Sequence, residues 1–238
     1  MLDFILIIML SVAMFGLLGW ILKYDDYGTK IDEKYDSYYE QYGIRDDLTE
    51  EEYEALPEEE KQKYLDASDA IQKDEEFNKL FYIFTNLTLI ISTFSILIAY
   101  LVLEFIVPLI YKNGQTIGKK IFAIGVMDTN GVRIKPIALF VRTILGKYTI
   151  ETMIPVMLIL RVLIFGTGGP LGLILIAVLL LMQIIFMATT RTHLAIHDLL
   201  ASTVTVDLPS QMIFDSVEAL NEYKKKLAAE KAENSEYF

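Results

Sequence analysis

Cysteine is absent from this sequence of 238 residues, and histidine occurs only twice. Without cysteine the chain has no disulfide, no thiolate metal site and no thiol nucleophile. His193 and His197 are four residues apart, which places them on one face of a helix, as in some zinc pairs. No third ligand of a suitable type accompanies them. We therefore expect no metal site and no cofactor.

Basic charge is also scarce, because 21 Lys and Arg residues stand against 32 Asp and Glu residues. The one basic segment, residues 111–148, is short and is flanked by apolar runs. It matches no motif that reads a nucleic-acid groove. We therefore expect no nucleic-acid partner.

Apolar residues are abundant, at 53% of the chain, and they gather in four runs. About 20 apolar residues suffice to cross a hydrocarbon layer of ~30 Å as a helix. The pattern predicts an all-α integral membrane protein with four transmembrane helices. We expect the second run to tilt, kink near Pro108 or leave the bilayer, because it is long. The runs are Phe4–Leu22, Leu80–Tyr111, Ile150–Phe165 and Leu171–Ala188. A cleaved signal peptide explains the first run less well, since no basic segment precedes it.

Charge is sorted along the chain. Residues 23–79 hold 20 acidic and 8 basic residues, whereas residues 111–148 hold 7 basic residues and one aspartate. Basic segments between membrane helices stay in the cytoplasm. We therefore expect a protein of the cell membrane with both termini cytoplasmic and an acidic insert, residues 23–79, outside. The expected core is 80–206, after a first helix in 1–22, and a cytoplasmic tail follows in 207–238.

The acidic insert has two interpretations. Thr49 followed by Glu52 is typical of a capping box, and Pro57 suits the first position of a second helix. These signals favour a helical pair on the membrane surface. The alternative is a solvated, partly disordered charged loop.

The basic segment predicts a small cytoplasmic layer. Residues 121–126 and 132–134 flank Asn130-Gly131, which favours a β-hairpin. An amphipathic helix is expected over Pro136–Lys147, with Arg142 near an apolar face that meets lipid. The lysines of this layer are expected to meet anionic lipid headgroups.

Two motifs, in combination, carry a family resemblance. They are Gly114-Gln-Thr116-Ile-Gly118-Lys119-Lys120 and His197-Asp198-Leu-Leu-Ala-Ser-Thr203-Val-Thr-Val206. With Arg142 between them, they resemble the RDD family of prokaryotic, multi-pass membrane proteins, over residues 1–22 and 80–206. That family is named for one arginine and two aspartates, and Asp3 and Asp198 match the aspartates. The arginine that the resemblance implies before Asp3 has no counterpart here, and the insert is longer than the resemblance implies. Some members of the family have been linked to cation/proton antiport.

The candidate site residues are polar groups in or beside the apolar runs: Asp3, Glu104, Arg142, His197 and Asp198. A carboxylate at membrane depth is costly and usually functional, although Asp3 can also lie at the interface. A carboxylate beside an imidazole can relay protons or hold a cation. The structural alternative is that Asp198 caps backbone amides or pairs with Arg142 or Lys119. The glycines of the first motif are expected to permit close backbone approach at a turn.

Three classes of function remain. The leading hypothesis is transport of cations, protons or a small solute, and we expect a homo-oligomer because four helices leave little room for a pathway. The alternative is a non-transporting adaptor or assembly factor, whose insert and tail bind partners. An intramembrane enzyme would have only His193, His197 and Asp198 to offer, so we expect no enzymatic activity.

Overall fold

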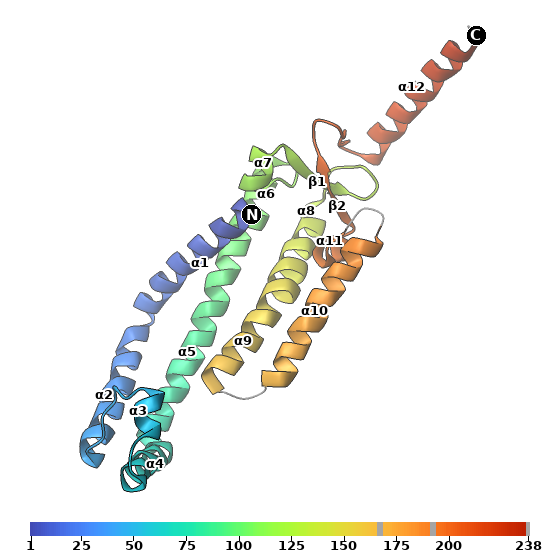
Figure 1. Cartoon of the computed structure of the whole chain (residues 1–238). Helices are drawn as coiled ribbons and strands as arrows, with labels where there is room; N and C mark the ends of the chain where they lie inside the picture. The colour runs from blue at the N-terminus through green and yellow to red at the C-terminus, as the bar shows by residue number, and fades with distance from the viewer. Residues whose placement is uncertain (166–168, 191–193, 237–238) are drawn as a thin grey trace. The chain divides into compact units, whose positions relative to one another are not determined.

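The computed structural model describes residues 1–165, 169–190 and 194–236 (Figure 1). The chain forms two compact units. Unit 1 comprises Met1–Met14 and Thr93–Phe238, and unit 2 comprises Phe15–Ser92. Most of the described residues are helical, as the apolar runs predict.

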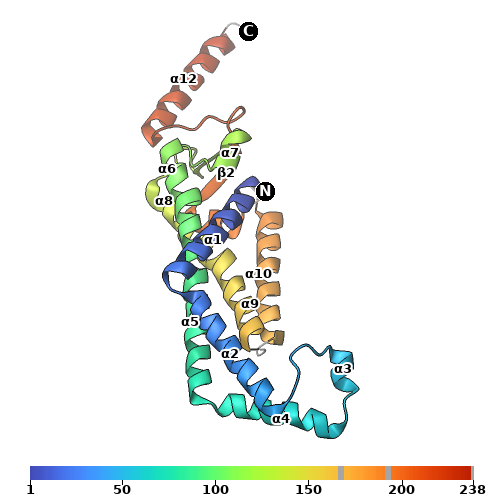
Figure 2. The same ribbon diagram turned by 90° about the vertical axis from the view of Figure 1, so that its left-hand side faces the viewer.

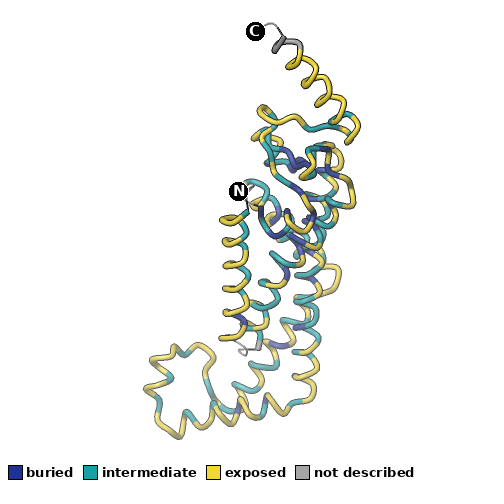
Figure 3. Tube along the Cα trace, turned by 90° about the vertical axis from the view of Figure 1, so that its right-hand side faces the viewer, coloured by how far each residue is buried: buried dark blue, intermediate teal, exposed yellow. Residues whose placement is uncertain are grey.

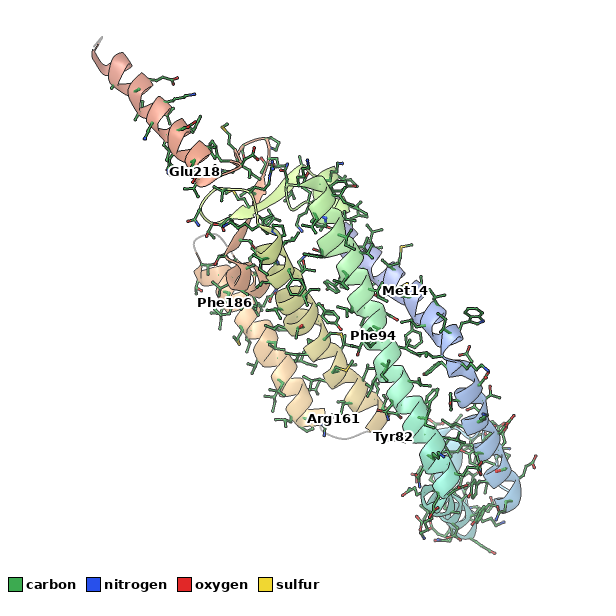
Figure 4. All side chains as sticks on the ribbon, turned by 180° about the vertical axis from the view of Figure 1, so that it is seen from behind. Met14, Tyr82, Phe94, Arg161, Phe186 and Glu218 are labelled. Carbon is green, nitrogen blue, oxygen red and sulfur yellow. The ribbon has the colours of Figure 1, made fainter. Side chains whose placement is uncertain are left out.

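Three of the described helices are long and apolar enough to cross a membrane. They are α1 (Leu2–Ile21), the continuous helix from α5 (Glu75–Tyr100) through η1 (Leu101–Ile106) to α6 (Val107–Tyr111), and α10 (Gly169–Thr189). Only 6% of the apolar window of α10 is buried within the protein, so its surface suits contact with lipid. Figure 4 shows Phe94 of α5 and Phe186 of α10 among the side chains that project from these helices. The chain is therefore a helical membrane protein.

The third predicted run does not form a helix of its own. It is the end of a continuous helix made of α8 (Pro136–Phe140), η2 (Val141–Met153) and α9 (Ile154–Phe165). The helix expected to begin at Pro136 is confirmed, but its expected end at Lys147 is wrong, and Arg142 is buried instead of lying beside lipid. Figure 1 and Figure 2 both show α9 beside α10 and antiparallel to it. Because this helix is not among the three spans, the count of four spans stays a prediction.

The helix over residues 75–111 contains a widened, π-helical segment, η1, and the helix over residues 136–165 contains another, η2. Pro108 explains part of the irregular hydrogen bonding of η1. It has no N–H, so the carbonyl of Glu104, four residues earlier, lacks its usual helical donor. The Thr143 hydroxyl of η2 donates to that carbonyl at 2.9 Å. Within η1 the hydrogen bonding shifts by one residue, since the Val107 N–H bonds to the Val102 carbonyl. Such widened turns are frequent at functional sites.

A two-stranded sheet joins distant parts of unit 1. Strand β1 (Ile124–Asp128) pairs antiparallel with β2 (Thr203–Asp207), with Val126 opposite Thr205. The expected hairpin is therefore wrong in its partner strand. Its turn is present, because the Gly131 N–H donates to the Asp128 carbonyl and Gly131 has φ +86°. Beyond that turn the described residues pair through the Met127–Arg133 bridge and the Asp128–Val132 backbone bond, whereas β2 pairs with β1 at five positions, four of them β-branched in β2.

The interior of unit 1 has two apolar clusters. One lies between helices and includes Ile7, Ala99 and Tyr148, and the other joins Val126 of β1 to Leu139 of α8. In Figure 3 the buried positions gather toward the end of unit 1 that holds the sheet and α11 (Ile196–Ala201). The last helix, α12 (Val217–Glu236), is mostly exposed. The best-packed part of unit 1 is thus where the polar motifs lie.

Unit 2 contains the acidic insert, which is helical. It comprises α2 (Tyr24–Tyr42), α3 (Glu50–Glu54), α4 (Glu58–Lys73) and the first part of α5. The capping box of Thr49 and Glu52 is confirmed, and Pro57 lies one position earlier than expected, at the N-cap of α4. An apolar cluster of Ile31, Ile71 and Phe77 holds the helices together. The helical interpretation of the insert is confirmed, and its place on a membrane surface stays a prediction.

Candidate functional site

A cavity of about 380 Å³ in unit 1 brings charged side chains together from four segments that are distant in sequence. Asp3 comes from α1, Glu104 from η1, Lys119 from α7 (Ile117–Ile121), and Lys147 and Glu151 from η2. The rest of the lining is largely apolar and includes Ile7, Tyr100 and Phe122. Ionisable groups gathered in an apolar setting within a membrane protein mark a functional site by default.

Asp3 is held by the first motif. Its carboxylate accepts a hydrogen bond from the Thr116 hydroxyl at 2.5 Å and another from the Gly118 N–H at 2.7 Å. Thr116 also caps α7, since its hydroxyl accepts from the Lys119 N–H. A Cβ on Gly118 would lie 2.8 Å from Oδ2 of Asp3, so a larger residue would displace the Asp3 carboxylate. The expected role of the glycines in close approach is confirmed here.

Glu104 is the most deeply buried carboxylate of the cavity, at 3% exposure. Its Oε2 pairs with Nζ of Lys147 at 2.5 Å. Both residues lie on the π-helical segments, which face each other. A buried carboxylate needs such a partner, because leaving it unpaired costs several kcal/mol.

Lys119 contributes a second positive charge to the cavity. Burial disfavours its ammonium form and, with the positive charge of Lys147, lowers the pKa of Lys119 to about 7. The carboxylates of Glu104 and Asp3 act in the opposite direction but do not compensate. The side chain can therefore exist in both protonation states near neutral pH.

Arg142 and Asp198 form a buried ion pair outside the cavity lining. Nε of Arg142 lies 2.8 Å from Oδ1 of Asp198, which also accepts from the Thr203 hydroxyl at 2.8 Å. Burial alone would raise the pKa of Asp198, but its interactions with His197 and Arg142 outweigh burial and hold that pKa well below its usual range. The pairing of Asp198 with Arg142 is thus observed, and it joins α11 and β2 to η2.

His197 lies between two carboxylates. Its Nδ1 is 2.9 Å from both oxygens of Glu151, and its Nε2 is 3.4 Å from Oδ2 of Asp198. The backbone N–H of His197 also donates to Glu151. This arrangement requires Gly146, because a Cβ there would lie 2.5 Å from the Cβ of His197. A chain of polar contacts therefore runs from Arg142 through Asp198 and His197 to Glu151, which lines the cavity.

The predicted site residues are divided between these two neighbouring groups. Asp3, Glu104, Gly118 and Lys119 line the cavity, whereas Arg142, Asp198 and His197 form an adjoining group of contacts. Gly114 lies against β1, where a Cβ would be 2.9 Å from the Cβ of Val126. His193 lies outside the described residues. No group of three or more His, Asp or Glu side chains within the described ranges could hold a metal ion.

Lys147 and Glu151 are site residues that the sequence analysis did not single out. A signal was present, since Thr143, Lys147 and Glu151 recur every four residues and so share one face of a helix. That face bonds Glu104 through Thr143 and Lys147, and His197 through Glu151. Polar residues at this spacing beside an apolar run are a usable indicator of a buried polar face.

Comparison with known proteins gives one match. The family model described as "RDD family" matches residues 1–202, which cover most of the chain, the whole first motif and the second motif as far as Ser202. No curated protein and no solved structure matches the chain.

Proposed function

The chain belongs to the RDD family and is a membrane protein, and from this premise we propose that it moves a small cation or protons across a cell membrane. The cavity of unit 1 would be the binding site, with Asp3 and Glu104 as its carboxylates. The observation that carries the proposal is the position of Glu104. This carboxylate is buried in a membrane helix, at a π-helical segment, and faces a cavity. Intramembrane carboxylates of this kind mark ion and proton pathways.

The contacts that link Arg142, Asp198 and His197 to Glu151 support the site, because Glu151 lines the cavity. They fix η2 against α11 and so position Lys147 and Glu151 at the cavity. Both nitrogens of His197 already face carboxylates, so we propose no enzymatic role for this residue. Asp198 acts in this proposal as a positioning residue.

The adaptor alternative has one observation in its favour, which is the folded helical insert. Its helices carry exposed acidic residues in their first turns and have their own apolar cluster. That function requires the insert and does not require a carboxylate in the cavity. The flux experiment below separates the two functions.

We expect the purified chain in proteoliposomes to show cation-dependent proton movement that Asp3→Asn and Glu104→Gln reduce by at least about tenfold. A tenfold reduction corresponds to the loss of about 1.4 kcal/mol of binding free energy. This is a modest loss for the removal of one carboxylate that binds the cation. A pH-sensitive dye inside the vesicles measures the flux. Glu222→Gln, which changes an exposed carboxylate of α12, is the control and should leave the flux unchanged. Wild-type flux no greater than that of empty vesicles would reject transport and favour the adaptor.

The proposed topology has the insert outside and the tail in the cytoplasm. Because the chain has no cysteine, single introduced cysteines report their location. Ser68→Cys on α4 and Ala229→Cys on α12 are at exposed positions. A membrane-impermeant maleimide should label Ser68→Cys in intact cells and Ala229→Cys only after permeabilisation. The opposite labelling pattern would invert the topology. Contact of the basic segment with anionic headgroups, and a homo-oligomer, are further parts of this proposal.

A further inference from the structure

Lys119 is a partly buried cation of unit 1 that differs from Lys147 and Arg142 in its pairing. Lys147 pairs with Glu104 at 2.5 Å, and Arg142 pairs with Asp198 at 2.8 Å. Among the residues that the structure describes, no ion pair within 4.0 Å includes Lys119, although its side chain lines the cavity. A buried ammonium without a close counter-ion is unfavourable. This partly buried lysine has no close counter-ion among the described residues.

The cavity also contains carboxylate oxygens that are not paired with a cation. Both oxygens of Asp3 accept hydrogen bonds, but neither donor, Thr116 or Gly118, is charged. At Glu104, Lys147 bonds Oε2, and within the described ranges no hydrogen bond reaches Oε1. The charged groups that surround Lys119 are Asp3 of α1, Glu104 of η1, and Arg142, Lys147 and Glu151 of η2. Of these side chains, three are carboxylates and two are cations, and Met1, with the N-terminal amino group, also lines the cavity.

We propose that Lys119 is a tethered counter-cation, which a small monovalent cation replaces in the cavity once the Lys119 ammonium has released its proton to water. This inference rests on the proposed function, because it takes the same cavity as the cation site. A charged Lys119 supplies positive charge to Asp3, whose two donors are uncharged, and to the cavity side of Glu104, which Lys147 also pairs. A neutral Lys119 leaves that charge to be supplied by an ion. The site accordingly exchanges one proton for one cation with no change in its net charge.

The environment of Lys119 supports the exchange. Burial and the charge of Lys147 lower the pKa of Lys119 to about 7, so that both of its forms are populated under physiological conditions. By linkage, a cation that binds only beside neutral Lys119 must lower that pKa further, and a proton must weaken cation binding. Lys120, the next residue, is not among the residues that line the cavity. Its Nζ lies over the ring of Tyr111 at 3.8 Å and the residue is exposed.

The test measures cation binding to the full chain in detergent. Calorimetry compares NaCl and KCl with choline chloride as the control salt. A pH-indicator dye counts the protons that are released on binding. Between pH 6 and pH 8 the affinity should rise about tenfold, because the neutral fraction of a group with a pKa near 7 rises by that factor. Release should be about 0.9 proton per cation at pH 6 and about 0.1 at pH 8.

Two variants of Lys119 give opposite expectations. Lys119→Gln removes the charge, so cation binding should become independent of pH and release no proton. Lys119→Arg keeps a charge that is not released near neutral pH, so binding should be lost throughout. Lys120→Gln is the matched control and should behave as the wild type. Secondary structure and elution volume confirm that each variant is folded.

Each outcome separates this inference from the proposed function. Wild-type affinity that is equal at pH 6 and pH 8, or pH-dependent binding that persists in Lys119→Gln, would overturn the role of Lys119 even where vesicles show flux. The absence of Na⁺ and K⁺ binding at every pH would overturn it as well. Binding with proton release but without flux would support the exchange and reject transport.

Discussion

Replacing Asp198 by alanine is expected to lower the free energy of unfolding by about 3–5 kcal/mol. The change leaves the Arg142 guanidinium buried, at 3% exposure, without its carboxylate. The Thr203 hydroxyl loses its acceptor at the same time, and His197 loses one of its two neighbouring carboxylates. Unfolding by denaturant in detergent micelles, followed by circular dichroism, measures the loss.

An exposed pair in the same unit provides the control. Arg133 and Asp215 lie 2.6 Å apart, but their side chains are 41% and 74% exposed. Asp215→Ala should therefore cost less than about 1 kcal/mol. The double replacement Arg142→Met with Asp198→Leu should recover much of the loss, because it removes the buried charge as well as its partner. Equal losses for Asp198→Ala and Asp215→Ala would show that the buried pair does not hold α11 in place.

Gly146→Ala is expected to separate α11 from η2 and to cost about 3 kcal/mol, the upper part of the range for overpacking. The new Cβ would lie 2.5 Å from the Cβ of His197 and 2.6 Å from its Cα, and backbone atoms cannot rotate away. The His197–Glu151 bond should break as the segments move apart. Denaturant unfolding measures the cost, and hydrogen exchange at the amide of His197, which donates to Glu151, measures the separation.

Gly16→Ala in α1 is the matched control, since a Cβ at that position meets nothing within 4 Å. Because alanine favours a helix over glycine by up to ~1 kcal/mol, this change should be neutral or stabilising. A stability of Gly146→Ala close to that of Gly16→Ala would contradict the close packing of η2 against α11.

The parts of the structure that depend on local pattern could be predicted from the sequence. Apolar length predicts α1 and α10, and the spacing of Thr49 and Glu52 predicts the capped start of α3. The requirement for glycine at position 118 also follows from its motif. The partner of that glycine does not, because Asp3 lies 115 residues away and only tertiary packing brings it there.

The errors arise where distant segments compete with local ones. A turn at Asn130-Gly131 predicts a hairpin, but the ladder with β2 satisfies more backbone groups than residues 132–134 could. The apolar and amphipathic runs after Pro136 are distinct in composition yet share one helix, whose widened segment carries the polar face. Sequence periodicity assumes 3.6 residues per turn and cannot register such a segment.

The pairing of β1 with β2 also constrains when the molecule can complete its fold. The two strands lie on either side of residues 129–202, so the ladder closes a loop that contains α8, η2, α9, α10 and α11. Contacts between such distant residues form slowly, because the entropy of loop closure must be lost before they stabilise the chain. During synthesis β1 therefore waits, as an unpaired strand edge, until β2 has emerged. The ion pair of Arg142 with Asp198 belongs to that same late step, and with it the completed support of the cavity.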